Sequence, residues 1–108
     1  MEFKEVASLK ELKIAKKMRI EVEQQPILLL LDQEEVFAMS DKCPHMGASL
    51  EKGTFENGVV TCAKHHAQID IRTGEVLEKA KILFLKMPTK KAKTYEVKVE
   101  GDKISVQV

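Results

Sequence analysis

The sequence contains no tryptophan, and aromatic residues make up only 5% of its 108 residues. With four phenylalanines and one tyrosine, any hydrophobic core must be built mainly from aliphatic side chains. The supply is adequate, because 44% of the residues are hydrophobic, an ordinary fraction for a globular chain. A chain of this length predicts a single domain that spans residues 1–108.

Long apolar runs and a strong charge of one sign are also lacking. The longest apolar run covers residues 26–31, far short of the roughly 18 residues that a membrane-spanning helix needs. Residues 1–5 are charged, unlike the start of a signal peptide. The net charge of +1 gives no indication of nucleic-acid binding. These absences predict a soluble cytoplasmic protein without a membrane or nucleic-acid partner.

Cysteine is scarce, and the two that are present lie close to all three histidines. Cys43 is followed by His45, and Cys62 is followed by His65 and His66. In the cytoplasm, such cysteines are more often metal ligands or reactive thiols than parts of a structural disulfide. Thiolates and imidazoles gathered in one stretch are a typical ligand set for a transition metal.

Several arrangements of these side chains can be weighed. A redox disulfide between Cys43 and Cys62 leaves the histidines unexplained, and a nucleophilic site needs only one thiol and one base. A tetrahedral zinc site is chemically permitted, although small zinc modules usually pair like ligands in each loop. The other metal arrangement has two metals, one bound by both thiolates and the other by two imidazoles.

Hydrophobic periodicity predicts a mainly β structure in the first part of the chain. Alternation indicates a half-buried strand at 17–22, and a continuous apolar run at 27–31 predicts a strand buried on both faces. Ser8 and Glu11 form a capping-box pattern, which we expect to give one helical turn and no longer helix. Further strands are expected at 2–7 and 36–39, with a turn at 24–26.

The second part of the chain continues this pattern. Asn57-Gly58 lies between the short segments 54–56 and 59–61 and predicts a tight hairpin, because both residue types tolerate positive φ. Short strands are expected at 68–71 and 76–77. Alternation from Tyr95 to Val99 and from Ile104 to Val108 predicts a terminal hairpin. The sequence therefore predicts an all-β chain, arranged as an antiparallel sandwich or barrel.

The cysteine and histidine segments resemble the cluster loops of Rieske [2Fe–2S] proteins. The run from Cys43 to Leu50, Cys-Pro-His-Met-Gly-Ala-Ser-Leu, matches the first loop, and Cys62-x-x-His65 matches the second. The similarity extends over the chain, to Asp70, Thr73, Gly74, Pro88 and the terminal hairpin. It implies a Rieske-like fold with a two-loop cluster-binding subdomain and one [2Fe–2S] cluster per chain. By this resemblance, Cys43 and Cys62 bind one iron, and His45 and His65 bind the other.

The second loop departs from the family pattern, which usually has Cys-Pro-x-His-Gly. Here Ala63 replaces the proline and His66 replaces the glycine. The spacing favours His65 over His66 as the ligand. Loss of the glycine removes the residue type that adopts positive φ most readily.

Respiratory-chain Rieske proteins carry a second cysteine in each loop and a hydroxyl close to the cluster. The corresponding positions here hold Met46, Lys64 and Ala67. Without those groups the reduced cluster is less stabilised, so the resemblance implies a low-potential, ferredoxin-like member.

The function implied by the resemblance is that of a soluble Rieske-type ferredoxin, which is not itself an enzyme. It would carry single electrons between a flavin reductase and a terminal oxygenase or other redox enzyme, as a monomer or weak dimer. Two alternatives stay open: a small Rieske subunit of a nitrite-reductase-like complex, and a zinc-binding structural module. The apolar segment 82–85 is either a core-facing extension of a strand or a docking patch.

Overall fold

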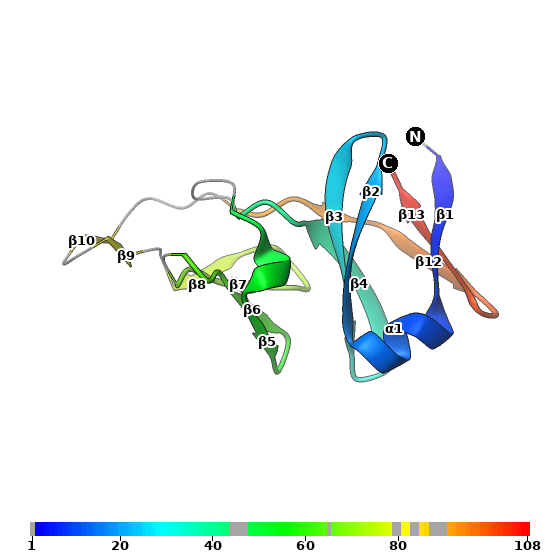
Figure 1. Ribbon diagram of the computed structural model, residues 1–108, viewed down its shortest axis with the longest axis horizontal. Coiled ribbons are helices and arrows are strands. Elements are labelled where there is room, and N and C mark those ends of the chain that lie inside the picture. The colour runs from blue at the N-terminus through cyan, green and yellow to red at the C-terminus, as the bar shows by residue number, and fades with distance from the viewer. Residues whose placement is uncertain (1, 44–47, 65, 79–80, 83–84, 87–90) are drawn as a thin grey trace.

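The computed structural model describes residues 2–43, 48–64, 66–78, 81–82, 85–86 and 91–108. We divide the chain into a base half, residues 2–40 and 94–108, and a loop half, residues 41–93. Figure 1 shows the base half on the right, with both chain ends on it, and the loop half on the left. The ends are joined, because Glu2 and Val108 exchange two backbone hydrogen bonds of 3.2 and 3.1 Å.

The base half consists of two antiparallel sheets. One has the strand order β1-β13-β12, and the other has the order β11-β4-β3-β2. Alternating apolar residues in these strands give each sheet one face that packs against the other sheet. The strands are β1 Phe3–Ser8, β2 Lys17–Val22, β3 Gln25–Asp32, β4 Glu35–Ser40, β11 Thr94–Tyr95, β12 Val97–Glu100 and β13 Lys103–Gln107.

Strand β3 is buried on both of its faces, as the sequence predicts. Ile27 and Leu29 point into the core between the two base sheets. Leu28 and Leu30 point into a second core, which contains residues of the loop half. All four side chains are 0% exposed. A continuous apolar run is thus explained by a strand that separates two cores.

The predicted single helical turn is wrong, because α1 spans seven residues, Leu9–Ala15. The predicted cap is confirmed, since the Ser8 hydroxyl accepts from the Glu11 amide at 3.4 Å. Leu12 is fully buried, and the Ser8 hydroxyl donates to the Asp102 carboxylate at 2.7 Å. Tertiary packing therefore stabilises a helix that would be marginal as an isolated peptide.

Two other boundaries differ from the sequence prediction. The first turn lies at Glu23 and Gln24, which have φ of 50° and 67°, so Pro26 falls inside β3, near its beginning. The terminal hairpin β12–β13 is confirmed, but Tyr95 belongs to β11 and pairs with Ala38 of the other sheet. The chain passes from one sheet to the other between residues 95 and 97, which period-two alternation alone does not reveal.

The loop half contains much shorter elements. The Asn57-Gly58 hairpin is confirmed, with φ of 50° and 75° at these residues. A four-stranded antiparallel sheet has the order β5-β6-β7-β8, and a short 3₁₀ helix, η1, precedes it. The elements are η1 Leu50–Lys52, β5 Thr54–Glu56, β6 Val59–Thr61, β7 Gln68–Asp70, β8 Val76–Glu78, β9 Lys81–Ile82 and β10 Leu85–Lys86.

The segment 82–85 lies only partly within the described residues. The described strands at this place, β9 and β10, form a separate two-stranded antiparallel sheet in which Ile82 pairs with Leu85. Residues 83 and 84 lie outside the described residues. Whether this segment faces the core or a docking partner therefore stays a prediction.

Candidate metal centre

The two predicted ligand loops are closed by the same backbone contact. The amide of Cys43 donates to the carbonyl of Ala48 at 2.7 Å, and the amide of Cys62 donates to that of Ala67 at 2.9 Å. In each loop the cysteine is the first residue, and the acceptor lies five positions later. Two segments with different sequences therefore have equivalent ends.

Both cysteines lie in the same apolar core. Cys43 is 3% exposed and Cys62 is 1% exposed, and they share this core with Leu28, Leu30 and Val60. No disulfide joins them. Burial of two thiolates without positive charge would be costly, and a bound metal supplies that charge. The chemistry and the burial of this donor pair fit the thiolate side of a metal cluster.

The two imidazole ligands of the predicted set, His45 and His65, lie outside the described residues. The structure thus brings the two cysteines of the predicted set into one core and says nothing of the two histidines. His66 is exposed and has a φ of 62°. Glycine occupies this position in the resembled motif, and the left-handed backbone explains why a glycine suits it.

A buried carboxylate, Asp41, ties the two ends of the first loop together. It is 2% exposed and accepts hydrogen bonds from the Ser49 hydroxyl at 2.6 Å and the Glu51 amide at 2.8 Å. Its third donor is Nε of Arg19 on β2, at 3.1 Å. Sequence reasoning missed Asp41. The available signal was a carboxylate between a buried strand and a ligand loop, where it can accept from backbone amides.

Strand β2 supplies two cations to this region. Nζ of Lys17 donates to the carbonyls of Glu51 and Gly53, at 2.5 and 2.7 Å. The guanidinium of Arg19 is shared between Glu21 and Asp41, and these carboxylates raise its pKa, Glu21 more than Asp41. Lys17 satisfies carbonyls at the end of η1 that have no helical partner. The first loop is thereby fixed to the base half by charged hydrogen bonds.

Gly53 allows the chain after the first loop to approach the strand that leads to the second. A Cβ at this position would lie 1.9 Å from the carbonyl oxygen of Thr61. No side chain can be accommodated there without a backbone shift. This close contact places the segments that carry Cys43 and Cys62 beside each other.

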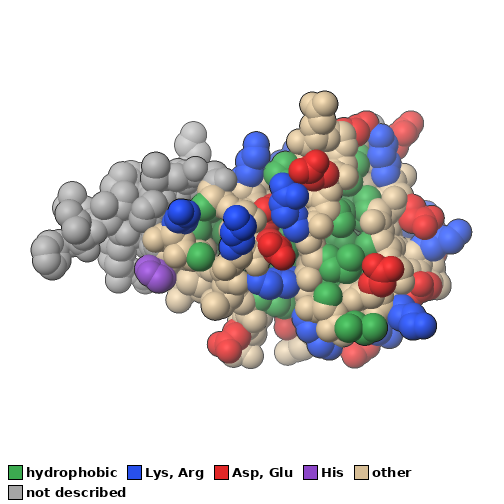
Figure 2. Space-filling view, viewed as in Figure 1, with side chains coloured by type: hydrophobic (Ala, Val, Ile, Leu, Met, Phe, Trp, Pro, Cys, Tyr) green, Lys and Arg blue, Asp and Glu red, His purple; other side chains and the backbone are tan. Residues whose placement is uncertain are grey.

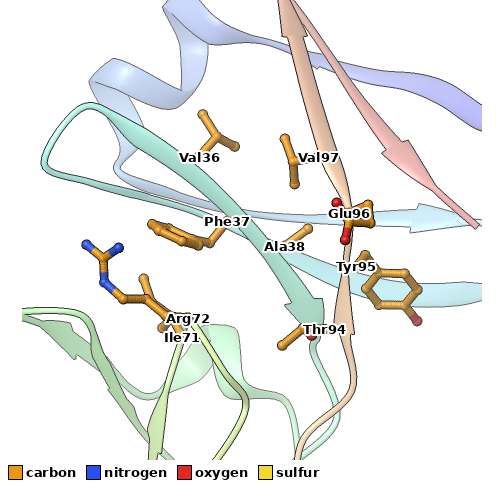
Figure 3. Close-up of a pocket in the computed structure, with 9 residues that line it drawn as sticks. All are labelled: Val36, Phe37, Ala38, Ile71, Arg72, Thr94, Tyr95, Glu96 and Val97. Atoms are coloured by element: carbon orange, nitrogen blue, oxygen red, sulfur yellow. The ribbon is translucent and has the colours of Figure 1, made fainter.

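A hollow of about 300 Å³ lies where the two halves meet. Figure 3 shows Arg72 reaching from the loop half toward Phe37 of β4, and its guanidinium carbon lies 4.8 Å from the ring centroid. Arg72 also contacts the Asp32 carboxylate at 3.2 Å. The residues that line this hollow include no cysteine and no histidine, so the hollow is separate from the predicted ligand set. They are Val36, Phe37, Ala38, Ile71, Arg72, Thr94, Tyr95, Glu96 and Val97.

Comparison with known proteins assigns a class to this arrangement. The family model of the Rieske [2Fe-2S] domain matches residues 2–83. The chain therefore belongs to the Rieske [2Fe–2S] family, and its cofactor is one [2Fe–2S] cluster.

Within this family the chain is similar to ferredoxin components of dioxygenases. It is 34% identical over 108 residues to the ferredoxin component of biphenyl 2,3-dioxygenase from Rhodococcus jostii, covering 100% of this chain and 94% of that protein. The carbazole 1,9a-dioxygenase ferredoxin from Nocardioides aromaticivorans superimposes with a TM-score of 0.79, at 28% identity, covering 98% and 97%. Mouse apoptosis-inducing factor 3 is 30% identical over 102 residues, which are 94% of this chain and 16% of that protein.

These comparisons confirm the Rieske resemblance, the all-β fold and the electron-carrier class that the sequence predicts. They favour this class over a zinc-binding structural module. Among the residues that the structure describes, no helix has the length and apolar character needed to cross a membrane.

Proposed function

We propose that the chain is a one-electron carrier of an aromatic-ring dioxygenase system, in which Cys43, His45, Cys62 and His65 hold the cluster. The observation that carries this proposal is the pair of equivalently closed loops with both cysteines buried in one core. The full-length match to dioxygenase ferredoxin components supports the role of carrier between a flavin reductase and a terminal oxygenase. We propose that the whole chain is one Rieske domain that works in the cytoplasm.

The residues of the chain perform three tasks in this role. A bound Rieske cluster supplies reversible uptake of a single electron. The apolar core under the loops excludes water from the cysteine side. Asp41, Lys17 and Gly53 hold the two loops in fixed positions, which keeps structural reorganisation during electron transfer small.

The second loop also favours a low reduction potential. Ala67 is 0% exposed, and its methyl group offers no hydrogen bond where a hydroxyl would stabilise added negative charge. We expect a potential nearer to that of ferredoxin-like members than to that of respiratory-chain members.

The ligand set is tested with protein isolated or reconstituted without oxygen. Wild type should show the visible absorption of a [2Fe–2S] protein and, after reduction, a Rieske-type electron paramagnetic resonance signal. Cys62→Ser and His65→Ala should abolish this signal, whereas His66→Ala should retain it. Loss of the signal in His66→Ala with retention in His65→Ala would overturn the assignment. A colourless protein with one zinc would overturn the cluster itself.

The role as a free carrier is tested against that of a permanent subunit. Co-expression with the products of neighbouring genes, followed by size-exclusion chromatography, should give a carrier that elutes alone in moderate salt. A stoichiometric complex that survives high salt would support the alternative of a small subunit in a multicomponent reductase. If the protein is a free carrier, the isolated and reduced protein should pass its electron to a separately purified oxygenase.

A further inference from the structure

The charges of this chain are unevenly divided between its two halves. Residues 41–93 contain ten lysines and arginines and six aspartates and glutamates, a net charge of +4. The rest of the chain has eight basic and eleven acidic residues, a net charge of −3. The overall charge of +1 therefore conceals a basic loop half attached to an acidic base half.

Four lysines of the loop half are exposed and have no anionic partner within the described part of the chain, whereas Arg72 pairs with Asp32. Lys42, Lys52, Lys64 and Lys93 are exposed, and none of them forms an ion pair with a described residue. Lys42 directly precedes Cys43, and Lys64 lies between Cys62 and His65. Figure 2 shows basic side chains beside the one described histidine, on the face that carries the loops.

Two of these lysines, Lys42 and Lys93, line one hollow. The hollow has a volume of about 210 Å³, and Gln25, Ser40 and Tyr95 also line it. The amide of Ser40 donates to the carbonyl of Lys93 at 2.8 Å, which joins the segments carrying the two lysines. Nζ of Lys93 lies 4.9 Å from the centroid of the Tyr95 ring. No acidic residue lines the hollow.

We propose that this basic face docks the acidic surface of a redox protein, and that a carboxylate of that partner enters the hollow between Lys42 and Lys93. The proposal rests on the carrier function and specifies the charge of its partner. Opposite charges raise the rate of encounter and select among partners. Because Lys42 adjoins Cys43, a partner held there lies close to the predicted cluster.

Binding of proteins of known charge tests the docking face. The oxidised holoprotein is titrated by calorimetry with cytochrome b5, an acidic probe, and with cytochrome c, a basic probe. At about 0.01 M ionic strength, where the screening length is roughly 30 Å, cytochrome b5 should bind and cytochrome c should not. Raising the salt to about 0.15 M should weaken the binding of cytochrome b5 several-fold.

Charge reversal identifies the lysines that contribute. The double variant Lys42→Glu, Lys93→Glu should weaken the binding of cytochrome b5 by about tenfold or more. The matched control Lys13→Glu, Lys16→Glu changes the net charge equally on exposed residues of the base half. It should leave the affinity within about twofold of wild type. The visible spectrum of each variant shows whether its cluster is retained.

A second measurement uses small ions as probes of the same face. Reduced protein gives one electron to ferricyanide, which becomes ferrocyanide, while the cluster returns to its diferric state. The Lys42→Glu, Lys93→Glu variant should react more slowly with anionic ferricyanide and faster with cationic tris(phenanthroline)cobalt(III). The control variant should change neither rate by more than about twofold.

The outcomes separate this proposal from the carrier function. A protein without a Rieske signal overturns the proposed function. A protein with the signal that binds cytochrome c in preference to cytochrome b5 overturns the docking proposal alone. Equal affinity of wild type and the Lys42→Glu, Lys93→Glu variant for cytochrome b5 also overturns it.

Discussion

The base half and the loop half are stabilised in different ways. Most base strands have four to eight residues, and β3 fills two cores at once. The described strands of the loop half have two or three residues. Their positions depend on a few residues, such as Asp41 with its hydrogen bonds and Gly53 with its close approach to the backbone of Thr61. Short strands bury little surface, so the loop half should be the less stable region and the more sensitive to single substitutions.

The largest effect on stability is expected for Gly53→Ala. The new methyl group would meet the backbone of Thr61, and relief requires the first-loop segment to move away from β6. We expect a loss of about 3 kcal/mol in the free energy of unfolding, together with partial loss of the cluster. Urea unfolding of the holoprotein and its visible absorption measure both effects.

Gly101→Ala in the base half is the matched control. Gly101 has a φ of 59°, but its Cβ would have no atom within 4 Å. Only backbone strain is added, which costs about 1 kcal/mol. If the two variants lose equal stability, the close approach at Gly53 does not hold the loops together.

Asp41→Ala should give the next largest effect. It removes the acceptor of three hydrogen bonds and leaves the Glu51 amide and the Ser49 hydroxyl without a partner. We expect a loss of about 2 kcal/mol and faster bleaching of the cluster in the presence of an iron chelator. Asp41→Asn should fall between this variant and wild type, because the amide oxygen can still accept.

Glu21→Gln serves as the control for Asp41. Glu21 also accepts from Arg19, at 3.2 Å, but its side chain is 60% exposed. The bleaching rate of Glu21→Gln should equal that of wild type, since exposed ion pairs contribute little. Faster bleaching in this variant would show that the Arg19–Glu21 ion pair also holds the loop.

The contrast between the halves also explains what the sequence could predict. The apolar run of β3 and the Asn57-Gly58 turn depend on local pattern, and both are confirmed. The extent of α1 depends on Leu12 burial and on Asp102, which lies far away in sequence. A local pattern carries no information about such a partner, so the sequence alone predicts too short a helix.

The same division applies to the candidate site. The spacing of cysteines and histidines predicts the ligands, because the residue type alone determines which metal-binding group a side chain offers. The structure places Cys43 and Cys62 in one core, and the assignment of Cys43, Cys62, His45 and His65 as ligands stays a prediction. The position of Asp41 before a ligand loop is visible in the sequence, but its partners Arg19 and Ser49 are not, because they converge on it only after β2 and the first loop come together. Tertiary contacts of this kind have no periodic signal.

A smaller effect is expected from His66→Gly. His66 has a left-handed backbone, with a φ of 62°, which costs a residue with a Cβ about 1 kcal/mol relative to glycine. The variant should therefore be more stable than wild type by up to about that amount, and its Rieske signal should be unchanged. His66→Ala, which keeps the strain, separates relief of strain from loss of the imidazole. Loss of the signal in both variants would show that His66 is a ligand.

The smallest effect concerns the base half and depends on pH. The Ser8 hydroxyl and the Lys10 amide donate to Asp102 at 2.7 and 2.9 Å, and together they lower the pKa of this carboxyl. A carboxyl whose pKa is lowered by folding stabilises the fold above its unfolded pKa of about 3.9. That contribution is lost as the pH falls through the lower, folded value.

Asp102→Asn should therefore reduce the protection of α1 amides from hydrogen exchange at pH 7, and the difference from wild type should shrink in acid. The Lys10 amide is the most direct probe, because its own hydrogen bond is changed. Glu5→Gln, at an exposed position of β1, is the control and should behave as wild type at both pH values. A difference between Asp102→Asn and wild type that stays constant down to about pH 3 would mean that the ionised carboxylate does not anchor α1. Because the change is confined to the base half, the bleaching rate of the cluster should not respond, in contrast to that of Asp41→Ala.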